Sequence, residues 1–101
     1  MDTYSIIQDA IRNKHSISAD YKGYHREMSP HLIGTKRGDA HLLSYQYGGN
    51  SSSGLPPGGN WRCMDVEKIQ NVRILEGVWH TGSSHTRPQN CVDEVDTVVP
   101  Y

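Results

Sequence analysis

Two arginines lie beside apolar residues in segments with strand-like alternation, a pattern typical of an anion-binding site. Arg26 lies an even number of residues from Met28 and Leu32, and Arg62 lies an even number of residues from Met64 and Val66, so each arginine shares a strand face with them. If the apolar side chains face the core, both guanidinium groups start on the inward side of a sheet and extend to its rim. A buried arginine needs an anion, and its planar donors match the two oxygens of a phosphate or carboxylate. The sequence therefore predicts a compact site for an anionic ligand.

Four further residues complete the predicted ligand-binding set. Tyr21, Tyr45 and His31 would surround the arginines with stacking faces and hydrogen-bonding groups. His41 would add a side chain that titrates near neutral pH.

Plainer interpretations of these residues stay open. The arginines could form internal ion pairs with acidic residues or extend along the surface, and the two tyrosines could line the core. His41 could be an ordinary exposed strand residue. The acidic partners considered for the arginines are Asp20, Glu27 and Asp65.

No other chemistry is indicated. The chain has no nucleophile–base or carboxylate pair with recognisable spacing, so we expect no enzyme activity. Its six histidines and two cysteines fit no zinc-ligand spacing, and no phosphate-binding P-loop is present, so we expect no metal and no cofactor.

Cysteine usage and the N-terminus predict a compartment. Cys63 and Cys91 are too few for a disulfide-rich secreted scaffold, and the first residues have no charged and apolar stretch typical of a signal peptide. We therefore expect a cytoplasmic protein with reduced thiols. A Cys63–Cys91 bridge is the alternative.

Length and composition limit the protein class. The chain has 101 residues, enough for one domain with a modest core. Ten Lys and Arg against eleven Asp and Glu give a net charge of −1, which argues against a wide basic surface that wraps nucleic acid. No apolar run is long enough to span a membrane.

The elements that must position these side chains are mostly strands. A helix is expected at about 3–14, capped by Asp2 or Thr3, with Ile6, Ile7, Ala10 and Ile11 forming its apolar stripe. Period-two patterns predict about five short strands, and such spacing is typical of a small sandwich or barrel. We expect the strands at about 17–21, 25–35, 40–47, 61–66 and 71–75.

The segments between and after these strands complete the outline. Arg26, Met28, Pro30 and Leu32 should share one face of the second strand. Because Pro30 has no N–H group, this strand should be bent there or lie at an edge of the sheet. Residues 48–60 have the composition of a mobile loop, and residues 66–69 resemble a helical turn. Residues 91–99 form either another strand or an appended helix.

The order of these segments resembles the WYL domain family over roughly residues 4–79. The matching segments are a strand ending in Tyr21, Arg26-x-x-x-Pro30, Gly38 to Tyr45, and Trp61 to Ile69. The Trp-Tyr-Leu signature aligns with Ala40-His41-Leu42, so only the leucine is kept. Met64 and Val66 replace the family's Phe and Leu and stay apolar.

The resemblance implies a fold and a role. It implies a mainly β domain with one N-terminal helix, a small SH3-like or Sm-like β-barrel at about 17–79 and a C-terminal extension at 80–101. It implies a regulatory ligand-sensing module, often joined to a helix-turn-helix unit and active in bacterial transcription regulation or phage defence. The segment before the first expected strand is too short for such a unit, so we expect a stand-alone module. The implied ligand is a nucleotide or single-stranded nucleic acid, bound through Arg26 and Arg62. The alternative is a protein-interaction subunit, a homodimer or the partner of a larger regulator.

Overall fold

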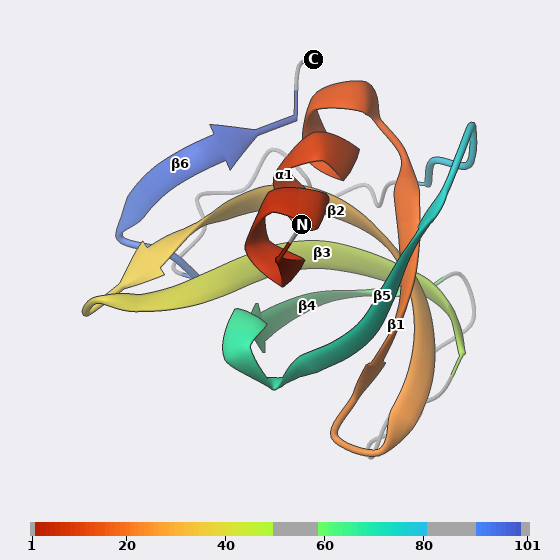
Figure 1. Ribbon diagram of the computed structural model, residues 1–101, viewed down its shortest axis with the longest axis horizontal. Helices are drawn as coiled ribbons and strands as arrows, with labels where there is room; N and C mark the ends of the chain where they lie inside the picture. Colours follow the sequence, from red (N-terminus) through yellow and green to blue (C-terminus); the bar gives the residue numbers. More distant parts are fainter. Residues whose placement is uncertain (1, 50–58, 81–90, 100–101) are drawn as a thin grey trace.

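The computed structural model describes residues 2–49, 59–80 and 91–99, which form one α-helix, one 3-10 turn and six β-strands (Figure 1). The element types agree with the sequence pattern, and most strands begin or end within two residues of the expected positions. The elements are α1 (Thr3–Asn13), β1 (Ser16–Tyr21), β2 (Tyr24–Lys36), β3 (Asp39–Gly49), β4 (Asn60–Asp65), η1 (Val66–Lys68), β5 (Ile69–Leu75) and β6 (Glu94–Val98).

All six strands belong to one antiparallel sheet with the order β4-β3-β2-β1-β5, and β6 also pairs with β2. β2 pairs with β3 along most of its length, while its other edge pairs first with β1 and then with β6. The mainly β class with one helix is confirmed. Within the described residues the end strands β4 and β5 do not pair with each other, so the sheet does not close into the expected barrel.

The register of β2 shifts between Pro30 and Leu32, as in a β-bulge. Met28 and Ile33 therefore both pack in the main core, on the sheet face toward α1, which we call the inner face. Leu32 packs in a second cluster with Leu43. The expectation that Leu32 shares the face of Met28 is wrong, because the extra residue reverses the alternation beyond the shift.

The helix α1 lies over the inner face of the curved sheet, with β1 and β5 on one side and β6 on the other (Figure 1). The Asp2 carboxylate accepts a hydrogen bond from the Ser5 amide at 2.8 Å and caps the first turn. Ile7, Ala10 and Ile11 are fully buried, so the predicted stripe is the packing surface. No helix in the described residues is long and apolar enough to cross a lipid bilayer.

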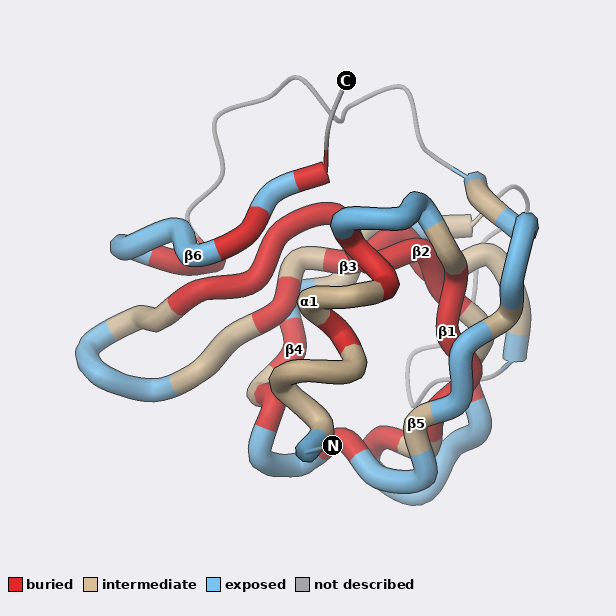
Figure 2. Tube along the Cα trace, turned by 45° about the horizontal axis from the view of Figure 1, so that its top comes forward, coloured by how far each residue is buried: buried red, intermediate tan, exposed pale blue. Residues whose placement is uncertain are grey.

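The open choice for residues 91–99 is settled as a strand. β6 lies close against β2 at Gly34, where a Cβ atom would collide with the Glu94 carbonyl group. The Tyr4 hydroxyl donates to Asp96 at 2.7 Å, and burial, together with this carboxylate, raises the pKa of Tyr4 to about 12. The helix and β2 thus both anchor β6. Figure 2 shows buried residues along the middle of β2 and β3 and exposed residues at the turns.

A disulfide joins Cys63 on β4 to Cys91, so the expectation of reduced thiols is wrong. The two residues are 28 positions apart in sequence, and the sheet brings their Cα atoms to 5.6 Å. From the sequence alone the bridge had little weight, because the expectation of reduced thiols rested on the predicted compartment. The pairing of the two cysteines depends instead on how the C-terminal segment returns to β2. Cys91 and Val92 pack with Leu32 in the second cluster.

Replacing both cysteines by serine (Cys63→Ser with Cys91→Ser) should lower the free energy of unfolding by roughly 3–4 kcal/mol, because the bridge closes a loop of about 28 residues in the unfolded chain. Urea titration of the wild type and the double variant measures the difference. Dithiothreitol should shift the wild-type midpoint and leave the double variant unchanged. Equal midpoints for the two proteins without reductant would contradict the assignment.

Candidate functional site

The Arg26 guanidinium is buried on the inner face of the sheet. Arg26 as a whole is 4% exposed and lies opposite Ala19 of β1, on the same face as Met28. The hydrogen-bond acceptors of the guanidinium are neutral: Nη2 donates to the Tyr21 carbonyl oxygen at 3.1 Å, and Nη1 donates to Gln46 Oε1 at 3.4 Å. The Nε atom is buried and has no hydrogen-bond partner. The predicted inward direction of Arg26 is confirmed.

The end of β3 is shaped to receive this side chain. Gln46 is fully buried, and its Nε2 donates to the Gly48 carbonyl at 3.0 Å, which directs its oxygen toward Arg26. Gly49 pairs with Arg26 and has a φ of +80°. A Cβ atom at Gly49 would collide with the His25 carbonyl group and the Arg26 Cα atom, so only glycine allows this approach.

Arg62 lies on β4 with its side chain on the same face as Met64, as its alternation predicted. Burial lowers the pKa of Arg26, and the nearby positive charge of Arg62 lowers it further. Ser44 on β3 lies directly opposite Arg62 and two residues before Gln46. Its hydroxyl is fully buried without a hydrogen-bond partner. Two like charges and two unused donors, Arg26 Nε and the Ser44 hydroxyl, thus occupy one region of the inner face.

No Asp or Glu side chain forms an ion pair with Arg26. All eleven Asp and Glu residues lie in the described parts of the chain, and none forms an ion pair with this guanidinium. Asp20 instead pairs with His25 at 3.5 Å, and Asp65 accepts the Glu67 amide at 3.2 Å. For Arg26, the alternative of an internal ion pair is therefore wrong.

Tyr21 belongs both to the core and to the surroundings of Arg26. Its ring is part of the main core, and the Arg26 Cζ atom lies 5.1 Å from the ring centroid, within range of a cation–π interaction. Its hydroxyl accepts the Asp65 amide at 3.1 Å, which fixes the ring against the end of β4. The two interpretations of Tyr21 that the sequence left open are both consistent with this position.

Tyr45 and His31 pack in a different cluster. Tyr45 alternates with Ser44 and Gln46 and so points to the opposite, outer face, where its ring meets Trp61 at a centroid distance of 5.3 Å. His31 lies between Trp61 at 4.7 Å and Trp79 at 4.6 Å. The structure does not bring these two residues to the arginines.

His41 lies near the other end of β3, eight positions before Gly49. Its Nδ1 atom is 3.1 Å from the Asp39 carbonyl oxygen, and it pairs across the sheet with Asp65 and Gly34. Of the six predicted ligand-binding residues, the structure gathers Arg26, Arg62 and Tyr21 and places the other three elsewhere.

Sequence reasoning missed Gln46 and Ser44. Both are polar residues on the face of β3 that also carries the buried Leu42, and that alternation was the available signal. It also missed Trp61, which pairs with Tyr45 across β3 and β4, and Trp79, whose contact with His31 depends on the path of the chain after β5. Among the described residues, no group of three or more His, Cys, Asp or Glu side chains could hold a metal ion.

The fold and the site together describe a β-rich domain with an arginine pair on the inner face of its sheet. No protein-family model, no curated protein and no solved structure matches the chain. The resemblance to the WYL family therefore stays a prediction from the sequence.

Ser44→Ala should leave the free energy of unfolding unchanged or raise it by about 1 kcal/mol in the absence of ligand, because the substitution removes a buried hydroxyl without a hydrogen-bond partner. Urea titration in chloride buffer, without added phosphate, measures this difference. The matched control is Ser29→Ala. The Ser29 hydroxyl forms a hydrogen bond with the Ser16 hydroxyl at 2.8 Å and accepts the His80 amide at 2.9 Å, so this variant should have a lower free energy of unfolding. A loss in Ser44→Ala as large as in Ser29→Ala would contradict the assignment.

Proposed function

We propose that this chain is a binding module, not an enzyme, and that its ligand presents a phosphate or carboxylate group to Arg26. The observation that carries the proposal is the burial of Arg26 without a carboxylate among residues that include every Asp and Glu of the chain. A buried charge with only neutral partners is unfavourable, and an anion would offset much of that penalty.

The surroundings of Arg26 favour an anion over a neutral ligand. The positive charge of Arg62 acts on Arg26, and a negative group beside both would reverse that repulsion. Arg26 Nε and the Ser44 hydroxyl have donor capacity that a phosphate or carboxylate oxygen can accept. These features together support an anion site more strongly than a structural role for Arg26 alone.

The finer assignment follows the WYL resemblance. It would make the module SH3-like or Sm-like in fold and a sensor or accessory factor in bacterial or phage regulation, with a nucleotide or single-stranded nucleic acid as ligand. The disulfide removes the basis of the cytoplasmic prediction, because thiols in the cytosol are normally kept reduced.

A second candidate function, a protein-interaction subunit, is favoured by β6. Within the described residues this strand pairs only with β2, and Val95 and Val98 are 50% and 51% exposed. An edge strand with exposed apolar side chains can accept a strand from another chain. Its acidic residues Glu94 and Asp96 argue against pairing of β6 with its own copy and favour a basic partner strand.

Inorganic phosphate should stabilise the wild type beyond the effect of chloride at matched ionic strength. At ten times the dissociation constant, ligand binding raises the free energy of unfolding by about 1.4 kcal/mol, a rise in Tm of roughly 6 °C for a domain of this size. Arg26→Gln should remove the phosphate-dependent part of the rise. Differential scanning calorimetry of each protein with and without phosphate gives the shift.

Arg73→Gln is the matched control, because Arg73 is exposed on β5 and the change in net charge is the same. It should keep the full phosphate shift. Arg62→Gln provides a second site variant if Arg26→Gln folds poorly. Equal shifts in wild type, Arg26→Gln and Arg62→Gln would show that phosphate binds elsewhere and would refute the proposed function.

A further inference from the structure

The turn between β2 and β3 carries the tripeptide Arg37-Gly38-Asp39. Arg37 and Gly38 have φ values of +52° and +85°, and positive φ at both central residues is typical of a two-residue type I′ hairpin turn. All three residues are exposed, and the turn lies at one extremity of the molecule (Figure 1). The hairpin therefore presents a cation and a carboxylate on either side of a glycine.

Both charged side chains at this turn are available to a partner. Within the described residues, Arg37 and Asp39 form no ion pair, either with each other or with another side chain. Apart from the chain neighbours of Gly38, a Cβ atom added there would have no atom within 4 Å, so the space around the glycine is open. A second molecule can therefore approach the backbone at Gly38 and contact the guanidinium and the carboxylate together.

The strands below the turn hold it in one conformation. Thr35 pairs with Ala40 of β3 on one edge and with Glu94 of β6 on the other, so three strands meet just below the turn. Because this pairing restricts the hairpin before any partner binds, less conformational entropy is lost on association than for a free peptide. The turn is thus preorganised for recognition.

We infer that the β2–β3 turn is a recognition site for a cell-adhesion receptor of the class that binds Arg-Gly-Asp. Such a receptor needs an acidic pocket for the guanidinium, whose planar donors pair with carboxylate oxygens. It also needs a bound divalent cation such as Mg²⁺, which takes the Asp39 carboxylate as a ligand. Gly38 leaves room for the receptor between these two contacts. This inference goes beyond the anion-binding function and uses none of its residues.

The disulfide is compatible with a partner of this kind. Cys63 and Cys91 are joined in the folded chain. Disulfides persist in oxidising environments, which include the outside of the cell. A cell-adhesion receptor presents its binding site in that compartment.

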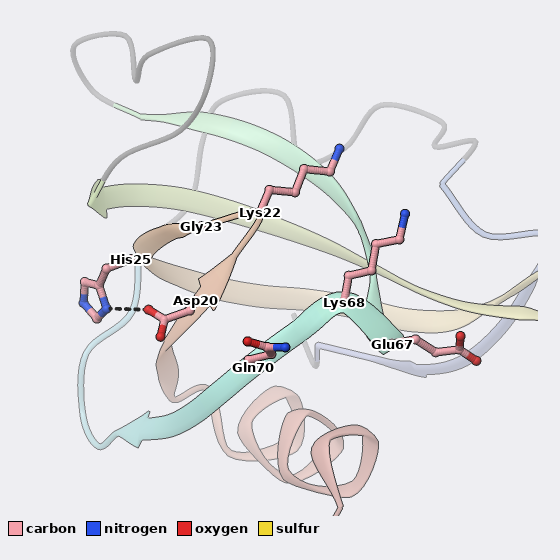
Figure 3. Close-up of a pocket in the computed structure, with 7 residues that line it drawn as sticks. All are labelled: Asp20, Lys22, Gly23, His25, Glu67, Lys68 and Gln70. Atoms are coloured by element: carbon pink, nitrogen blue, oxygen red, sulfur yellow. Dashed lines mark ion pairs between the residues drawn. The ribbon is translucent and has the colours of Figure 1, made fainter.

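The β1–β2 turn provides a matched comparison within the same chain. Lys22 and Gly23 have φ values of +52° and +82°, close to those of the β2–β3 turn. Tyr24 follows the glycine in place of an aspartate. Figure 3 shows Lys22 extending from this turn, with Asp20 and His25 joined by an ion pair of 3.5 Å. This turn therefore presents a cation without a free carboxylate, and the receptor should not bind it.

Surface plasmon resonance of the full chain over an immobilised integrin ectodomain that binds linear Arg-Gly-Asp peptides tests the inference. In buffer with Mg²⁺ the wild type should bind, and both EDTA and an excess of such a peptide should remove the signal. Asp39→Glu should weaken binding at least about tenfold, because the longer side chain displaces the carboxylate from the cation while the net charge is unchanged. Asp93→Glu makes the same change at another exposed aspartate and should bind as the wild type does.

Gly38→Ala and Gly23→Ala separate recognition from folding. Each variant places a methyl group in open space at a residue with positive φ, so both should lower the Tm in differential scanning calorimetry by a similar amount. Only Gly38→Ala should lose receptor binding, because its methyl group lies between Arg37 and Asp39.

The absence of wild-type binding on a surface that still binds the peptide would overturn the inference, as would binding that survives EDTA or Asp39→Glu. Equal losses of binding in Gly38→Ala and Gly23→Ala would assign the effect to folding and would overturn it too. The anion site is tested separately, because Asp39→Glu should keep the full phosphate-dependent rise in Tm whatever the receptor result.

Discussion

The path of β2 is the constraint on which the rest of the structure depends. This strand pairs with β3 on one edge and with β1 and β6 in turn on the other, so it holds the two halves of the sheet together. The register shift after Pro30 lets Met28 and Ile33 both enter the main core. The same strand carries Arg26 inward at its first half, where β1 and β3 supply its neutral partners. Fold and site therefore share one strand.

The arginine site is unfavourable for the folded chain alone. Burial and the charge of Arg62 both weaken the preference of Arg26 for its charged form, and Ser44 adds a buried hydroxyl without a partner. Natural domains usually pair or hydrogen-bond such groups, and exceptions concentrate at functional sites. An anion bound between the two arginines would satisfy the charge and the donors together. His31 makes ring contacts with Trp61 and Trp79, and Trp79 also packs against the main core.

The alternation of apolar and polar residues in the sequence predicts which sheet face some side chains occupy, but not all of them. Met28 and Arg26, or Met64 and Arg62, share a face because strand side chains alternate, and this could be predicted without a partner strand. Leu32 could not be placed, because a bulge reverses the alternation and leaves no mark beyond Pro30. Tyr45 and His31 were assigned to the site by residue type. The alternation along β3 already places Tyr45 on the face opposite Ser44 and Gln46, whereas the position of His31 depends on the register shift in β2. The Cys63–Cys91 bridge required the tertiary return of the C-terminal segment.

The central claim is that the buried Arg26 guanidinium binds an anion. The NMR signal of its Nε–H group is the most direct measure of such binding. In a ¹⁵N-labelled sample, two-dimensional NMR of the arginine Nε–H groups during titration with phosphate follows each side chain separately. The account predicts a saturating shift of the Arg26 signal and slower exchange of its proton with solvent, while the exposed Arg73 signal stays in place. A titration in which Arg26 moves no more than Arg73 would contradict the account.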